Sequence, residues 1–253
     1  MAKEVSMIVS WNGGLVEEGE ISISAFDPML LRGQGVFETV RVVDGEPRFW
    51  GEHFERLSRS GDSLIPEMPK REVLESQIQE VVEANELKNS RVRVTLGTNL
   101  LITAEPLEDD IPIVNVAIAD HWPVNERSPL VGIKCTSYAE NMRILRQFGT
   151  GEVIRSNTRG ELCEGCISNV FFVKEGRIYT PSLETGCLPG VMRSQVIRRN
   201  RVEEGKWPLE ILLEADEIWL SNAIRRLRCV SILDGKEMPP PSDFFWEVRH
   251  KIP

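Results

Sequence analysis

The stretch GQGVFETVRVVDGEPRFWGEHFERL, residues 33–57, decides the fold of this 253-residue chain. Its first half is rich in β-branched and aromatic residues, which favour a strand. Asp44-Gly45 then separates two such runs, and this dipeptide is typical of a tight hairpin turn. From Glu52 the apolar residues recur near helical spacing, with charged residues between them. The stretch therefore predicts a strand, a hairpin and then a helix at about residues 52–64.

The surrounding segments extend this pattern into an α+β unit. A second helix is expected at about residues 70–87, and further strands at VSMIVSW, RVRVTLG and IPIVNVAIA. The stretch DHWPVNERSP, residues 120–129, is polar, contains two prolines and has little periodicity, which indicates a linker at about residues 118–128. We therefore expect a smaller N-terminal α+β domain at 1–117 and a larger C-terminal domain at 129–253.

The C-terminal part is rich in strands. They are expected at EVIRS, at the hairpin NVFFVKEGRIYT, and at EIWLSN and RCVSILDG. One helix is expected at residues 138–147, and another after the Leu188-Pro189-Gly190 turn. This predicts a mixed sheet with few helices, and an α+β (mixed α/β) fold class for the chain.

Composition limits the classes of function. Hydrophobic residues make up 41% of the chain and charged residues 27%, which is typical of globular proteins. No apolar run has the length of a membrane helix, and the N-terminus lacks the apolar core of a signal peptide, so we expect a cytoplasmic protein. The formal net charge of −9 argues against a nucleic-acid partner, because neutralising phosphates needs a basic face.

The five cysteines suggest reduced thiols rather than a disulfide framework, because their number is odd and no secretory signal is seen. Cys163 and Cys166 form one C-x-x-C pair, which raises a zinc or redox interpretation. A structural zinc site needs a second pair of ligands, and His53, His121 and His250 have no ligand spacing among them. We therefore expect no metal site.

Five blocks, in this order, resemble the class IV aminotransferase family, the fold type IV pyridoxal-phosphate enzymes. The resemblance runs from about residue 11 to 235 and implies a D-amino-acid-aminotransferase-like fold with a C-terminal pseudo-barrel. The family includes branched-chain and D-amino-acid aminotransferases and aminodeoxychorismate lyase. The blocks are GQGVFETVRVVDGEPRFWGEHFERL, IKCTSYAEN, GELCEGCISNVFFVKEGRIYTP, LPGVMR and LSNAIRRLRCVSILDG.

By this resemblance the cofactor is pyridoxal 5'-phosphate, and Lys134 is the catalytic Schiff-base lysine. A lysine needs desolvation, a neighbouring cation or the Schiff base itself to react near neutral pH. Glu164 resembles the glutamate that faces the pyridine nitrogen, where a carboxylate favours the protonated, electron-withdrawing ring. Tyr138 is placed near the phenolic oxygen of the cofactor. The C-x-x-C pair falls inside the Glu164 block, which is a simpler explanation for it than a metal.

The phosphate is expected to lie between Arg56 and two turns. A guanidinium can donate two hydrogen bonds to phosphate oxygens. Gly190 lets the chain tighten, so that the amides of Val191 and Met192 begin a helix whose N-terminus favours a dianion. The turn at Asn222 and Ala223 resembles another ligand-facing segment. Some relatives have threonine where Met192 and Ala223 stand, which predicts greater reliance on backbone amides here.

Two reactions share such a cofactor site, transamination and the elimination of pyruvate from aminodeoxychorismate to give 4-aminobenzoate. Thr39 resembles a threonine that assists proton transfer in the lyases, and the PGVMR and SNAI segments also resemble theirs, so the lyase is favoured. Arg93 resembles a position near the substrate carboxylate in branched-chain enzymes, which keeps transamination open. Leu100, Leu101 and Ile102 stand in the loop where the D-amino-acid enzymes carry a carboxylate trap, which weakens that alternative.

A catalytically degenerate, ligand-binding member is a third alternative. Gln34 replaces a more usual aspartate, Arg32 adds charge before the motif, and the interval from Lys134 to Glu164 is short. The presence of Lys134, Glu164 and Arg56 argues for an enzyme. The resemblance also implies a homodimer acting on a small molecule. Residues 98–105 are expected to form a loop near the site.

Overall fold

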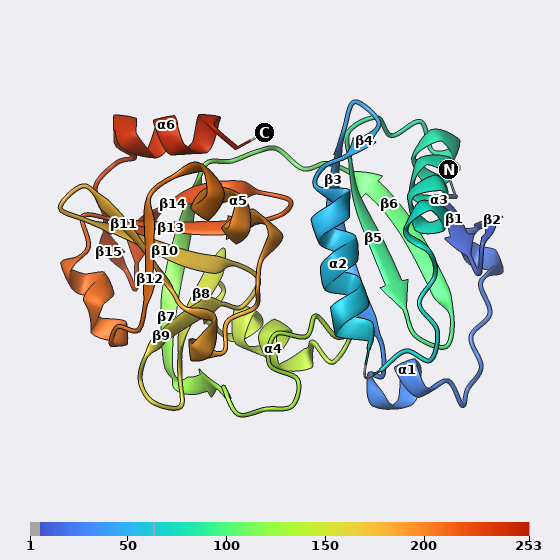
Figure 1. Cartoon of the computed structure of the whole chain (residues 1–253), viewed down its shortest axis with the longest axis horizontal. Coiled ribbons are helices and arrows are strands. Elements are labelled where there is room, and N and C mark those ends of the chain that lie inside the picture. The colour runs from blue at the N-terminus through green and yellow to red at the C-terminus, as the bar shows by residue number, and fades with distance from the viewer. Residues whose placement is uncertain (1–5, 63, 253) are drawn as a thin grey trace. The chain divides into compact units, whose positions relative to one another are not determined.

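The computed structural model describes residues 6–62 and 64–252, which form two compact units. Unit 1 contains Met1–Glu108 and Ile133–Ser137, and unit 2 contains Asp109–Gly132 and Tyr138–Pro253. Figure 1 labels the elements of each. Both units combine helices with a sheet, so the expected mixed α/β class is confirmed.

Unit 1 is built on a six-stranded antiparallel sheet in the order β2-β1-β6-β5-β3-β4. Two longer helices, α2 and α3, accompany it (Figure 1). The elements are β1 Ile8–Trp11, β2 Gly14–Glu17, the 3-10 helix η1 Glu18–Glu20, α1 Pro28–Arg32, β3 Val36–Val43, β4 Glu46–Pro47, α2 Trp50–Gly61, α3 Arg71–Ala84, β5 Ser90–Leu96 and β6 Leu100–Pro106.

The hairpin and helices of unit 1 follow the local sequence. Asp44 and Gly45 have φ values of 55° and 82°, the left-handed pair that a type I′ turn requires, so the predicted hairpin is confirmed. Helix α2 begins two residues before the expected start and ends at Gly61. Helix α3 ends at Ala84 because Glu86 turns to a left-handed φ of 56°, where the chain reverses toward β5.

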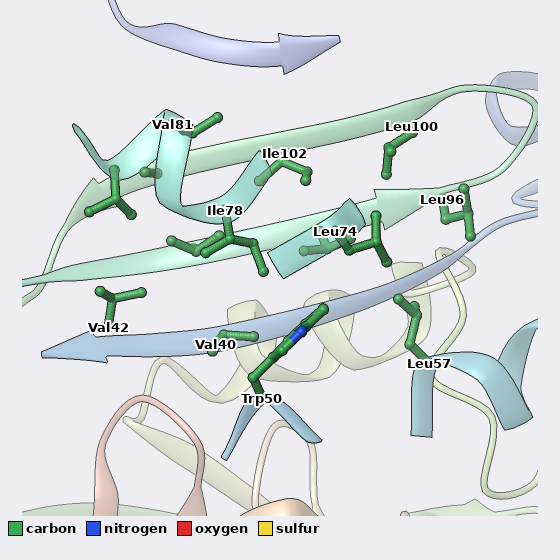
Figure 2. Packing of buried hydrophobic residues seen from close by; sticks show 14 of the residues in the cluster. Val40, Val42, Trp50, Leu57, Leu74, Ile78, Val81, Leu96, Leu100 and Ile102 are labelled. Atoms are coloured by element: carbon green, nitrogen blue, oxygen red, sulfur yellow. The ribbon is translucent and has the colours of Figure 1, made fainter. Parts of the chain in front are cut away.

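Strand β3 separates two kinds of side chain. Its even-numbered apolar residues Val36, Val40 and Val42 are fully buried in the core that α2 and α3 share with β5 and β6. Figure 2 shows this core. Successive side chains of a strand point to opposite faces, so Phe37, Thr39 and Arg41 project from the other face of the sheet. One face of β3 therefore packs into the core of unit 1, and the side chains of the other face lie outside that core.

Unit 2 contains a nine-stranded mixed sheet in the order β12-β11-β10-β13-β14-β7-β8-β9, with β15 paired to β14. Strand β9 also lies beside β10, which curls the sheet into a half-barrel. The elements are β7 Ile113–Val124, α4 Ala139–Phe148, β8 Glu152–Asn157, β9 Leu162–Gly165, β10 Asn169–Lys174, β11 Arg177–Pro181, η2 Leu183–Thr185, α5 Val191–Arg199, β12 Val202–Gly205, η3 Leu209–Glu214, β13 Glu217–Asn222, β14 Arg226–Leu233, β15 Lys236–Glu237 and α6 Asp243–His250.

The boundary between the units differs from the expected ranges 1–117, 118–128 and 129–253. Residues 118–124, expected in a linker, complete β7, which pairs in parallel with β8 and shifts register between Ala119 and Val124. The irregular stretch keeps Asp120 and Pro123 exposed, which explains the polar, proline-containing sequence. Residues 133–137 join unit 1 rather than unit 2, through a bridge between Val36 and Cys135.

The segment near 98–105, expected as a loop, is also a strand for most of its length. β5 and β6 pair from Ser90↔Pro106 to Leu96↔Leu100, so only residues 97–99 turn. Leu100 and Ile102 are buried in the core, which accounts for their apolar character. Within the described residues, no helix is both long and apolar enough to span a membrane.

Candidate active site

Arg56 lies in a buried cluster with Glu38 and His53. The Arg56 Nε and Nη2 atoms each lie 2.7 Å from a Glu38 carboxylate oxygen, and His53 Nδ1 lies 2.7 Å from Glu38 Oε2. Burial by itself raises the pKa of Glu38, but Arg56, with His53, holds that pKa well below its usual range. The pairing fixes the Nε–Nη2 edge of the Arg56 guanidinium.

The main chain of Lys134 is locked to β3 and α2. Phe37 N donates to Lys134 O at 2.9 Å, and Thr136 N donates to Gly35 O at 2.8 Å. On the other side, Lys134 N donates to Ser60 Oγ at 3.2 Å. Residues 133–137 thus extend the sheet of unit 1 beyond β3, although the sequence placed them in the C-terminal domain.

Three residues predicted to act in the reaction share one face of this sheet. Thr39 lies directly opposite Arg93 in the β3–β5 pairing. The Val36↔Cys135 bridge sets Phe37 opposite Lys134. Since alternate strand residues share a face, Thr39, Arg93 and Lys134 project on the same side, opposite the hydrophobic core. The structure therefore gathers the expected catalytic and substrate-binding residues of unit 1 on its core-free face.

In unit 2, Glu164 on β9 is tied to the turn before α5. Its Oε2 accepts a hydrogen bond from Leu188 N at 2.8 Å, and Asn169 Nδ2 donates to Leu188 O at the same distance. One peptide segment is thus held by a carboxylate and by an amide. Asn169 was not singled out from the sequence, although it lies within the Glu164 block.

The role of Gly190 differs from the one expected. Its φ of −66° is ordinary for any residue, so the turn does not depend on the conformational freedom of glycine. A Cβ on Gly190 would instead lie 1.9 Å from Asn169 Oδ1. Glycine is required because the Asn169 side chain occupies the space that a side chain at 190 would fill.

Helix α5 begins where an anion would be stabilised. Gly190 is its N-cap residue, no side chain of the described part of the chain caps it, and Val191 and Met192 are its first two residues. The Met192 side chain is 3% exposed and contributes no hydroxyl, so backbone amides are the donors at this end. At the second turn, Asn222 Oδ1 accepts from Ile224 N and Arg225 N, which folds residues 222–225 around Ala223.

Tyr138 precedes α4 and is mostly buried. Its hydroxyl donates to Cys166 O at 2.9 Å. Burial, together with the negative charge of Glu164, raises the pKa of Tyr138 above its ordinary value. The phenol is therefore protonated at physiological pH and acts as a hydrogen-bond donor.

A buried acidic side chain that the sequence analysis did not single out supports the turn that follows Glu164 along the chain. Glu152 is fully buried, accepts from Val153 N at 3.0 Å and from Ser168 Oγ at 2.6 Å, and also accepts from Ile167 N. Ser168 Oγ in turn accepts from Asn222 Nδ2 at 3.4 Å. Burial raises the pKa of Glu152 above its ordinary value. The available signal was an acidic residue at the start of the strand predicted at EVIRS.

Both cysteines of the pair within the Glu164 block are buried. Cys163 and Cys166 are free thiols in the protein interior. Burial raises the pKa of both, that of Cys166 to about 12, which disfavours the reactive thiolate. Among the residues that the structure describes, no group of three or more His, Cys, Asp or Glu side chains could hold a metal ion.

Comparison with known proteins identifies the family. The model of the family "Amino-transferase class IV" matches residues 35–233. The aminodeoxychorismate lyase of Bacillus subtilis is 33% identical over 241 residues, 84% of this chain and 82% of that protein. The D-alanine aminotransferase of Listeria innocua is 28% identical over 260 residues, covering 92% of this chain and 89% of the relative.

A solved structure supports the same fold. The branched-chain aminotransferase of Thermoproteus uzoniensis with norvaline has a TM-score of 0.88 and 26% identity, covering 98% of this chain and 94% of that one. The predicted fold type IV architecture is therefore confirmed. With most of its length matched by the family model and a relative one-third identical, the chain belongs to the class IV aminotransferase family of pyridoxal-phosphate enzymes.

Proposed function

We propose that this chain is an aminodeoxychorismate lyase, which eliminates pyruvate from 4-amino-4-deoxychorismate to give 4-aminobenzoate. The observation that carries the proposal is the shared face of Thr39 and Lys134, because elimination needs a proton donor and a proton acceptor near the same substrate. The similarity to the Bacillus subtilis lyase supports the same choice. Formation of 4-aminobenzoate would serve the synthesis of folate.

The described residues fit pyridoxal 5'-phosphate. In unit 1, Lys134 offers the amine, and the Arg56 guanidinium, which Glu38 holds in place, would bind the phosphate. In unit 2, the uncapped start of α5 offers the amides of Val191 and Met192. The turn at Asn222 and Ala223 would add further contacts to the phosphate.

The remaining cofactor contacts would come from two residues already tied to their surroundings. Glu164, anchored by Leu188 N, would keep the pyridine nitrogen protonated. Tyr138 would hold the phenolic oxygen by redirecting to it the single O–H donor that Cys166 O accepts in this structure. When bound, the cofactor withdraws electrons from the substrate carbon that carries the amino nitrogen.

Each residue on the reactive face of unit 1 has a proposed task. Arg93 would bind a substrate carboxylate, for which a guanidinium is well suited. The Lys134 amine would remove the ring proton, and the Thr39 hydroxyl would assist protonation of the departing enolpyruvyl group, which leaves as pyruvate. Loss of the ring proton and of the enolpyruvyl group makes the ring aromatic, and this drives the elimination forward.

An aminotransferase acting on branched-chain or related amino acids is the second candidate. Arg93 favours it equally, because a carboxylate is common to both substrate classes. The similarity to the Thermoproteus uzoniensis enzyme also supports it. A ligand-binding protein without catalysis is a minor alternative, against which the presence of Lys134 argues.

We also propose a homodimer in the cytoplasm. Phe26, Leu30 and Leu31 are 86%, 62% and 58% exposed, an apolar surface that a partner subunit would cover. Light scattering on the purified protein should give twice the monomer mass. A monomeric mass at micromolar concentration would contradict the dimer.

The reaction is tested with purified protein loaded with pyridoxal phosphate. We expect 4-aminobenzoate from aminodeoxychorismate, and a visible absorption band that Lys134→Ala abolishes. Thr39→Val, which keeps the shape but removes the hydroxyl, should lower the rate by roughly 10²- to 10⁴-fold, the range for general acid–base catalysis. Turnover of branched-chain amino acids with a 2-oxo acid, without 4-aminobenzoate from aminodeoxychorismate, would instead establish the aminotransferase.

A further inference from the structure

The Phe37 ring contacts two cations of the reactive face. Arg93 Cζ lies 3.7 Å from the ring centroid, and Lys134 Nζ lies 4.4 Å from it. Phe37 is 3% exposed, although it projects away from the hydrophobic core of unit 1. Both distances fall within the roughly 6 Å over which a cation is attracted to an aromatic face.

The pairing of the neighbouring strands brings these three residues together. Phe37 N bonds Lys134 O at 2.9 Å, and the adjacent Val36↔Cys135 bridge places Phe37 directly opposite Lys134. Arg93 is the diagonal neighbour of Phe37, because Thr95 pairs with Phe37 and Thr39 pairs with Arg93. Cross-strand and diagonal neighbours are the positions within reach of an aromatic side chain.

The side-chain ends of Arg93 and Lys134 both lie near the Phe37 ring. The aromatic quadrupole supplies negative potential at the face of the ring, which attracts the Arg93 guanidinium and the Lys134 side chain while that side chain carries positive charge. A leucine of similar bulk would fill the space but would offer no such potential. The arginine is further fixed by a hydrogen bond from its Nε to Thr95 Oγ1 at 3.1 Å.

We propose that Phe37 is a positioning residue whose ring holds the Lys134 amine and the Arg93 guanidinium at a fixed separation. A substrate whose carboxylate binds Arg93 then presents its reacting carbon to Lys134 at a set distance. The inference rests on the proposed function and deepens it, because it names what aligns the carboxylate anchor with the amine. It applies to a lyase and to an aminotransferase alike.

The first test observes the contact without any reaction. In protein labelled with carbon-13 at the lysine ε position, the aromatic ring current should shift the Lys134 signal upfield. Lys134→Arg identifies that signal by removing it. The shift should persist in Phe37→Tyr and disappear in Phe37→Leu. A Lys134 signal at the same position in wild type and in Phe37→Leu would overturn the inference, whatever the protein catalyses.

The second test varies the potential of the ring while keeping its shape. Replacing Phe37 with mono-, di- and trifluorophenylalanine withdraws electrons from the ring face in steps. We expect kcat/KM to fall with each fluorine, by roughly 3- to 30-fold over the series, the range expected from typical cation–π strengths. Phe37→Tyr should restore nearly wild-type kcat/KM, and all variants should unfold at similar temperatures.

The outcomes separate the two proposals. A flat fluorine series, in enzyme that retains the Lys134-dependent absorption band, would show that Phe37 acts only as apolar bulk, and the positioning role would be refuted alone. An absorption band that persists in Lys134→Ala would refute the proposed function. The ring-current measurement would still decide whether the Phe37 ring holds the amine.

Discussion

Gly190 lies against Asn169 so closely that a methyl group on the glycine would stand 1.9 Å from the asparagine oxygen. The same Asn169 donates to Leu188 O, so it holds the turn that begins α5 while occupying the space beside it. The start of α5 is thus shaped by a side chain from β10 rather than by glycine conformation.

Gly190→Ala should weaken the binding of pyridoxal phosphate, because the turn must move away from Asn169 and carry the amides of Val191 and Met192 with it. We expect at least a 10-fold increase in the dissociation constant, measured by fluorescence titration of cofactor-free protein. Gly19→Ala, where the structure places nothing within 4 Å of the new methyl group and the backbone has no left-handed φ, is a control for general damage.

Asn169→Ala combined with Gly190→Ala separates the two effects. The double variant should bind the cofactor better than the product of the single effects predicts, because the missing side chain leaves room for the methyl group. Additive losses would argue that Gly190 is needed for another reason.

Glu38→Gln should destabilise unit 1 by about 3–5 kcal/mol, the usual cost of removing one partner of a buried ion pair. The low pKa of Glu38 in the folded state means that its contribution is present above the unfolded value of about 4.5 and is lost as the pH falls. The stability gap between wild type and variant should therefore narrow in acid. Chemical denaturation from pH 7 down to pH 3 measures it.

Glu247→Gln is the matched control, because Glu247 pairs with Lys251 on the surface of α6. Exposed pairs contribute about 0–1 kcal/mol, so this variant should unfold like wild type. An equally small effect of Glu38→Gln would contradict a strong Glu38–Arg56 pair.

Glu152→Gln should have the opposite pH dependence. Because burial raises its pKa, folded protein keeps a proton that unfolded protein releases above about pH 4.5. The free energy of unfolding of the wild type should therefore fall as the pH rises. Because glutamine does not titrate, the variant should become more stable relative to the wild type between pH 4.5 and 8. Thermal unfolding across this range tests the sign. If the variant instead becomes less stable relative to the wild type at high pH, Glu152 is stabilised as an anion.

Tyr138→Phe should change the spectrum of the cofactor more than the stability of the fold. The variant loses one hydrogen bond to Cys166 O, worth about 0.5–1.5 kcal/mol, and Asn141 still donates to that oxygen. Without the phenol near the cofactor oxygen, the absorption band should shift and its pH titration should move. An unchanged band would place Tyr138 away from the cofactor.

Local patterns were sufficient to predict the strand, hairpin and helix of residues 33–57, because turn chemistry and apolar spacing act over short distances. The helix expected at residues 138–147 is observed as Ala139–Phe148 for the same reason. The separation of Thr39 from the core also follows from the two-residue period of a strand.

Features that depend on distant pairing were less accessible. Nothing near Lys134 in the sequence indicates that its segment pairs with β3. Residues 118–124 have the polarity of a linker because β7 is irregular and partly exposed there. The need for glycine at position 190 comes from Asn169, which is 21 residues away and has no local signature.

The alternation along β3 has an evolutionary consequence. Even positions from 36 to 42 contribute to folding, through the core or through the Glu38–Arg56 pair, whereas Phe37 and Thr39 project from the opposite face, where we propose that the reaction takes place. Substitutions at odd positions can thus redirect specificity while the scaffold survives. A single inserted residue would exchange the two sets at once, so divergence in this strand should proceed by replacement and never by a change in length.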